Sequence, residues 1–179
     1  MEALELWQRV LQGKTCLAGI GNELRGDDGF GPYFIELMKE KSLFPSANLL
    51  TVEDVPENYA FPLSEKDVDN VVFVDAVLLK APPGTVIFGP LAEFEEIGEI
   101  VSTHKLSLKL TSQLIEKTGK KVFLLGVVPE TTSFGQELSP AIKKITEELA
   151  TLTEQLVNKK FSVNGPEAPA GVQLERKKG

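Results

Sequence analysis

A run of fourteen residues near the start of the chain constrains the fold more than any other feature of the sequence. This run, residues 19–32, reads GIGNELRGDDGFGP and follows a short apolar segment that begins at Thr15. Its glycines permit backbone conformations that other residues resist. Its proline suits the first turn of a helix. The run is therefore predicted to be the loop between a first β-strand and a helix.

The composition of this loop favours a cation over a phosphate group. Phosphate is bound by backbone N–H groups and positive charges, whereas the loop carries the adjacent carboxylates of Asp27 and Asp28. The dinucleotide pattern G-x-G-x-x-G also fails, because Leu24 occupies the place of the third glycine. Carboxylates on a pliable loop suit a metal ion. We expect the loop to hold a cation.

The composition is that of a globular domain. The chain has 179 residues, 42% of them apolar and 25% charged. We predict a single domain over residues 1–160 and a C-terminal tail over residues 161–179. The net charge of -7 argues against broad binding of nucleic acid or anionic membranes. With no apolar run long enough to span a membrane and an acidic N-terminus unlike a signal peptide, a cytoplasmic protein is predicted.

Strands and helices are predicted to alternate along the chain. The apolar run at 71–74 predicts a strand buried on both faces, which is typical of parallel sheets, and Asp75 ends it. Cys16, the only cysteine, lies in the first predicted strand and is expected to be a buried core residue. Ser139 and Pro140 predict the start of a long final helix. Further strands are expected at 48–52, 85–88 and 121–126, and helices at 4–11, 32–41, 58–64 and from about residue 104. The predicted fold class is α/β: a three-layer α/β/α domain with a mostly parallel, twisted sheet of about five strands.

Three polar features are predicted near the carboxyl ends of strands, where open α/β sheets bind ligands. They are the Asp27–Asp28 pair, Asp75, and His104, the only histidine. Two carboxylates and one imidazole would suit zinc, nickel or manganese and would leave positions open for water or substrate. Each residue also has an ordinary structural explanation, as a helix cap, a strand cap or a surface residue at a helix start. Glu53 and Asp54 are expected at the same edge of the sheet.

Several motifs together resemble the [NiFe]-hydrogenase maturation endopeptidases. Besides the loop at 19–32 they are VVFVDAV at 71–77, Pro-Gly-Thr at 83–85, STHKL at 102–106 and LGVVPE at 125–130. The ordered combination of an acidic loop, a strand ending in Asp and Ser-Thr-His is specific, and the resemblance covers about residues 15–157. The sequence DDGFGP is more similar to the branch that serves formate-hydrogenlyase-type or coenzyme-F420-reducing hydrogenases than to other branches.

The resemblance implies a metal-dependent, aspartyl endopeptidase-like activity. Such an enzyme removes the C-terminal extension of the hydrogenase large-subunit precursor after nickel insertion and recognises the substrate-bound nickel. Carried onto this chain, the nickel-binding and catalytic set is Asp28, Asp75 and His104. The nickel would be presented by the substrate, and zinc or cadmium would take its place in crystals. The implied partner is the precursor, with no nucleic acid and no membrane insertion.

The residues leave the details of the reaction open. The metal would polarise the peptide carbonyl or activate a water, or a carboxylate of Asp28 or Asp75 would act as general base. Four further loop residues are expected to position the loop or the substrate: Gly21, Asn22, Asp27 and Gly29. The main alternative is a non-enzymatic nickel carrier or sensing module that uses the same three ligands. Carriers more typically have His- or Cys-rich tracts, whereas this chain has one of each residue. A related peptidase acting on spore proteins is a further alternative, which the motifs disfavour.

Overall fold

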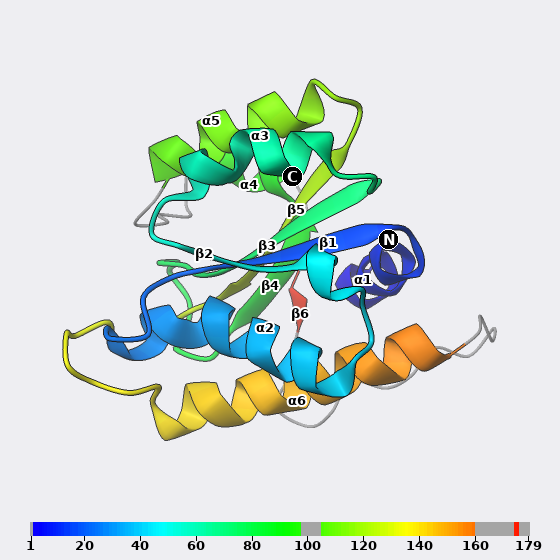
Figure 1. The fold of residues 1–179 in the computed structure, drawn as a ribbon. Coiled ribbons are helices and arrows are strands. Elements are labelled where there is room, and N and C mark those ends of the chain that lie inside the picture. Colours follow the sequence, from blue (N-terminus) through cyan, green and yellow to red (C-terminus); the bar gives the residue numbers. More distant parts are fainter. Residues whose placement is uncertain (1, 98–104, 160–173, 176–179) are drawn as a thin grey trace.

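A computed structural model describes residues 2–97, 105–159 and 174–175 of the chain. A mixed sheet lies between two layers of helices (Figure 1). Its strand order is β2-β1-β3-β5-β4-β6, in which β2, β1, β3 and β5 run parallel and β4 runs antiparallel to β5. The strands are β1 Thr15–Ile20, β2 Leu49–Glu53, β3 Asn70–Ala76, β4 Val86–Pro90, β5 Lys121–Val127 and the short β6 Leu174–Glu175. The predicted fold class is confirmed.

The helices divide between the two faces of the sheet. Helices α1, α2 and α6 cover one face, and α3, α4 and α5 cover the other (Figure 1). The α-helices are α1 Ala3–Gln12, α2 Phe30–Lys41, α3 Ala60–Glu65, α4 Leu91–Ile97, α5 Lys105–Glu116 and α6 Pro140–Asn158, and the 3-10 turns are η1 Gly26–Gly29, η2 Ser46–Asn48 and η3 Pro56–Tyr59. Helix α4 and strand β6 were not predicted from the sequence. No helix among the described residues is long and apolar enough to cross a membrane.

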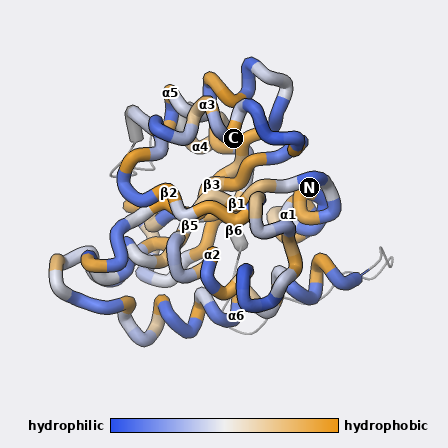
Figure 2. The backbone as a smooth tube through the Cα atoms, viewed as in Figure 1, coloured by the Kyte–Doolittle hydropathy of each residue, from blue (hydrophilic) through white to orange (hydrophobic). Residues whose placement is uncertain are grey.

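The central strands are buried on both faces, as the apolar run in β3 predicts. Successive strand residues point to opposite faces, so Val72 and Val74 pack under α1, α2 and α6, while Val71 and Phe73 pack under α3, α4 and α5. Figure 2 shows the central strands as hydrophobic and the outward parts of the helices as hydrophilic. Each fully buried side chain of this size contributes roughly 1.5–3 kcal/mol, so the sheet depends on both helix layers.

Cys16 belongs to this core and not to a reactive site. It lies in β1 and is fully buried, as predicted. Burial raises the pKa of the Cys16 thiol to about 11, which keeps it protonated and unreactive at neutral pH.

Helix α2 approaches the sheet closely at its first turn. A side chain at Gly31 would overlap the carbonyl oxygens of Ile20 in β1 and Val74 in β3. Only glycine therefore allows the start of α2 to rest on the carboxyl ends of these two strands. The β1–α2 connection, which carries Asp27 and Asp28, is held at that edge of the sheet as a result.

Candidate active site

Asp28 and Asp75 lie at the carboxyl edge of the sheet, on neighbouring elements. Asp28 is in the turn η1 after β1, and η1 contacts β3. Asp75 is the last residue but one of β3, so it lies inside the strand instead of ending it as predicted. Asp75 is 0% exposed and Asp28 is 7% exposed. Buried carboxylates cost free energy unless they are hydrogen-bonded or bind a cation, so two of them at one edge mark a candidate site.

The loop closes on itself around Asp28. The backbone N–H of Asn22 donates to Oδ2 of Asp28 at 2.9 Å. Gly21 has a φ of 134°, and a side chain there would overlap the backbone oxygen of Asp28. The glycine thus supplies both a conformation and a space that other residues lack, and the Asp28 carboxylate is held in one place.

The side chain of Asn22 links two loops of this edge. Its Oδ1 accepts from the N–H of Leu24 at 2.9 Å, which fixes the turn, and its Nδ2 donates to Oδ2 of Asp54 at 3.3 Å. Gly29 stands at the N-cap of α2, where a Cβ would lie 3.3 Å from the Cα of Glu23. Asn22 and Gly29 therefore shape the loop that carries Asp28.

Asp27 has a different environment from its neighbour. It is 0% exposed, and its two carboxylate oxygens accept four hydrogen bonds of 2.7 to 3.0 Å from the β5–α6 connection. The donors are the N–H groups of Glu130, Thr131 and Ser139 and the hydroxyl of Ser139. Ser139 occupies the N-cap position of α6, as predicted, but its hydroxyl binds Asp27 and makes no cap hydrogen bond. Asp27 thus joins two loops and has little capacity left to bind a metal ion.

His104, the third predicted ligand, lies outside the described residues. Helix α5 begins at the next residue, Lys105, and leads into β5 at the amino edge of the sheet. The N-terminal end of α5 is therefore directed toward the carboxyl edge. Within the described part of the chain, no group of three or more His, Cys, Asp or Glu side chains is arranged to hold a metal ion. The described carboxylates of Asp28 and Asp75 fit two positions of the predicted three-ligand set by their chemistry, since carboxylate oxygen is a ligand for nickel and zinc alike.

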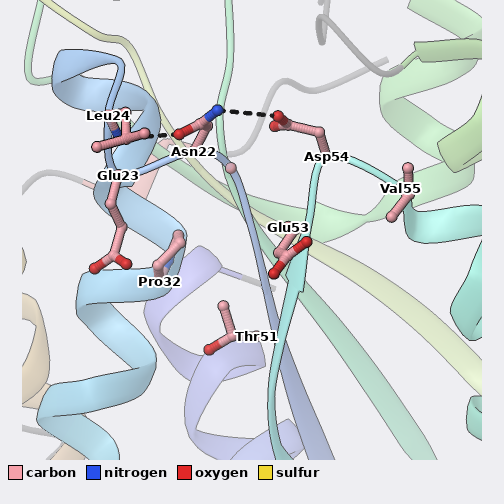
Figure 3. A pocket seen from close by; sticks show the side chains of 9 residues that line it. Asn22, Glu23, Leu24, Pro32, Thr51, Glu53, Asp54 and Val55 are labelled. Atoms are coloured by element: carbon pink, nitrogen blue, oxygen red, sulfur yellow. Dashed lines mark hydrogen bonds between the residues drawn. The ribbon is translucent and has the colours of Figure 1, made fainter. Parts of the chain in front are cut away.

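A cleft of about 320 Å³ opens between the loops after β1 and β2, beside Asn22 (Figure 3). The Glu23 side chain enters it from the β1–α2 loop and the Glu53 side chain enters it from β2. Glu53 and Asp54 line this edge, as expected from the sequence. Glu53 has a φ of 54°, in the left-handed region that glutamate rarely adopts. The complete lining is Gly21, Asn22, Glu23, Leu24, Pro32, Thr51, Glu53, Asp54 and Val55.

The fold and this edge define the class of protein: an open α/β domain whose candidate functional groups lie at the carboxyl ends of its strands. The model of one protein family, described as hydrogenase maturation protease, matches residues 32–156. The chain belongs to the hydrogenase maturation protease family.

Individual relatives agree with this assignment. The chain is 31% identical to the hydrogenase 3 maturation protease of Escherichia coli K12 over 135 residues, which cover 72% of this chain and 81% of that protein. The crystal structure of a [NiFe] hydrogenase maturation protease, HycI, from Thermococcus kodakarensis is similar with a TM-score of 0.71 and 33% identity over 86% of this chain and 99% of the other. The solution structure of the endopeptidase HycI from Escherichia coli has a TM-score of 0.64 and 25% identity over 79% of this chain and 90% of the other. The branch of the family stays a prediction.

Proposed function

We propose that this protein is an endopeptidase that removes the C-terminal extension of a [NiFe]-hydrogenase large-subunit precursor after nickel insertion, in the cytoplasm. Membership of the maturation protease family supports the reaction class. The observation that carries the assignment to this site is the placement of two buried carboxylates, Asp28 and Asp75, on adjoining elements of one sheet edge.

In this proposal the nickel ion arrives with the substrate. Asp28 and Asp75, together with His104, offer ligands to it. The bound metal supplies a fixed position for the scissile peptide and polarises its carbonyl group. The protein contributes a prearranged site, because the N–H of Asn22 holds the Asp28 carboxylate and the strand β3 holds Asp75. Prearranged ligands lose little freedom when the substrate binds.

The alternative role for a carboxylate at this edge, in place of binding nickel, is that of proton acceptor for the attacking water. Asp28 is the better candidate, since it is 7% exposed and Asp75 is 0% exposed. A carboxylate in this role takes the water proton as the water attacks the carbonyl carbon, and the proton then passes to the leaving amine. Gly21, Asn22, Asp27 and Gly29 support the reaction indirectly, by keeping the loop in the conformation that holds Asp28.

The test uses the cognate large-subunit precursor, prepared with and without inserted nickel. Each form is mixed with this protein, and the mass of the large subunit is measured. We expect loss of a C-terminal peptide from the nickel-loaded form only. Cleavage of both forms would contradict the nickel requirement, and nickel binding by this chain without any cleavage would favour a carrier.

A further inference from the structure

Two large apolar side chains are exposed beside the candidate site. Leu24, in the β1–α2 connection, is 62% exposed, and Phe134, in the β5–α6 connection, is 77% exposed. Single exposed apolar residues are common on proteins, but exposed aromatic and aliphatic side chains on adjoining segments are typical of interaction surfaces.

The two loops that carry these side chains are joined to each other. The N–H of Gly135 donates to the carbonyl of Leu24 at 2.7 Å, and the N–H of Gly26 donates to the carbonyl of Gln136 at 2.8 Å. Figure 1 shows the yellow β5–α6 connection beside the blue β1–α2 connection. The hydrogen bonds of Asp27 to the same connection add a further link. Leu24 and Phe134 are therefore carried on one hydrogen-bonded unit, which also carries Asp28.

The acidic cleft adjoins Leu24. Glu23, Glu53 and Asp54 line it, whereas no lysine or arginine is among the residues that the structure places around it. Val55, on the β2 side of the cleft, is 36% exposed. The surface thus offers apolar contacts next to a concentration of negative charge, which attracts a partner segment of positive charge. The same charge disfavours a second copy of this acidic chain, because a symmetric contact at this edge would bring like charges together.

We propose that Leu24 and Phe134 form a docking surface for the large-subunit precursor. An apolar segment of the precursor packs on these two side chains, and a neighbouring basic side chain of the precursor lies against the carboxylates of the cleft. This inference rests on the proposed function, since a segment docked here is delivered beside Asp28. Apolar contacts of this kind supply affinity at the centre of an interface, and the acidic rim supplies orientation.

The apolar part of the proposal is tested with Leu24→Ser and Phe134→Ser, alone and combined. The control is Leu114→Ser, because Leu114 is 42% exposed on α5, near the end of the helix that leads to the amino edge. Steady-state processing of nickel-loaded precursor gives kcat and KM for each variant. We expect the double variant to raise KM about tenfold or more with kcat within about twofold of the parent. The control should change neither constant, and an unchanged KM in the double variant would overturn the proposal.

The charge part is tested with Glu53→Gly. Glycine adopts the left-handed conformation of residue 53 without strain. We therefore expect this variant to unfold at the wild-type temperature or above it, so that weaker docking is not explained by a loss of folded protein. The control is Glu116→Gln, which removes an exposed carboxylate on α5. We expect Glu53→Gly to raise KM several-fold at low salt and by less at high salt. An effect no larger than that of the control would overturn the role of the cleft.

Direct binding separates this inference from the proposed function. Affinity of the nickel-loaded precursor for the wild-type protein and for the Leu24→Ser, Phe134→Ser double variant is measured by calorimetry at a temperature at which cleavage is slow. If the wild type processes the precursor and both proteins bind it with equal affinity, the docking proposal is overturned while the proposed endopeptidase activity stands. Weaker binding by the double variant would support docking even if no cleavage occurred, in which case only the proposed endopeptidase activity would fail.

Discussion

The amino edge of the sheet carries an exposed, paired carboxylate, whereas the carboxyl edge carries buried carboxylates beside the exposed Glu53 and Asp54. At the amino edge, Asp67 pairs with Lys14 at 2.9 Å, and these side chains are 94% and 63% exposed. At the carboxyl edge, Asp27, Asp28 and Asp75 are all buried. An exposed ion pair contributes little to stability because water and salt screen it, whereas a buried carboxylate requires compensation from the protein or a ligand. This difference makes the carboxyl edge the candidate functional edge.

The carboxyl edge itself contains two kinds of buried carboxylate. Asp27 receives its compensation from four donors of the protein. Asp28 accepts a backbone hydrogen bond and faces the loop that borders the cleft. Burial alone therefore does not identify a catalytic group, because Asp27 is as buried as Asp75 and yet its carboxylate holds the β5–α6 connection.

The largest expected effect comes from removing the candidate catalytic charges. Asp28→Asn and Asp75→Asn should each slow processing of nickel-loaded precursor by about 100-fold or more, since each removes a charged ligand for the nickel and Asp28→Asn also removes the candidate proton acceptor, whose loss costs roughly 10²–10⁴ in rate. Asparagine keeps the volume of aspartate, so circular dichroism and the unfolding temperature should show an intact fold. The matched control at the amino edge is Asp67→Asn, which should process at the wild-type rate. Full activity in either test variant would remove that residue from the reaction.

The next effect is on stability and compares one glycine from each edge. Gly21→Ala at the carboxyl edge combines a positive φ with overlap of the Asp28 backbone oxygen, so we expect a loss of about 4 kcal/mol. Gly119→Ala, in the turn after α5, meets only the positive φ of 86°, with no atom beyond its chain neighbours within 4 Å of the new Cβ. Its loss should be about 1 kcal/mol. Urea unfolding measures the free energy of unfolding of both variants. Equal decreases would show that the loop around Asp28 rearranges to accommodate the new side chain.

A smaller loss is expected when the link made by Asp27 is broken. Asp27→Ala leaves the N–H groups of Glu130, Thr131 and Ser139 without their acceptor, which should cost about 2–3 kcal/mol. Ser139→Ala removes only the hydroxyl donor and should cost about 1 kcal/mol. Urea unfolding again reports the difference. If Asp27→Ala is as stable as Ser139→Ala, the backbone hydrogen bonds that Asp27 accepts from the β5–α6 connection do not contribute to the free energy of unfolding.

The smallest effect concerns Cys16 in the core and depends on pH. Its folded pKa of about 11 lies above the reference value of 9.0, so the native state keeps its proton where the unfolded chain loses it. This contribution to stability is fully present below pH 9 and is lost as the pH rises toward 11. The loss amounts to about 1 kcal/mol at pH 10. The measurement is the free energy of unfolding at pH 8 and pH 10 for the wild type and for Cys16→Ala. A fall of the same size in both proteins would assign it to other groups.

Much of the fold could be predicted from local patterns. The continuous apolar run predicts β3 as a buried strand, and Ser139 with Pro140 predicts the start of α6; both are confirmed. Helix α4 was missed because its sequence, LAEFEEI, is short and no capping residue precedes it. The antiparallel direction of β4 was not predicted either, because the direction of a strand depends on its connection and partner instead of its own residues.

The site could be predicted only in part. The sequence places Asp28 and Asp75 after strands, where α/β domains bind ligands, and only the family resemblance, not the local pattern of residues, distinguishes Asp28 from Asp27. The exposure of Leu24 and Phe134 has no signal in the sequence, since an apolar residue in a loop can as easily be buried.

The sequence by itself determined where the glycine-rich turn, the buried strands and the acidic residues occur, because these depend on conformational preferences and periodicities within a few residues. Only the tertiary structure decided which groups donate hydrogen bonds to each aspartate. Those of Asp27 come from residues 103 to 112 positions further along the chain. Hydrogen bonding and burial depend on groups that folding brings together, so two adjacent aspartates acquire different surroundings.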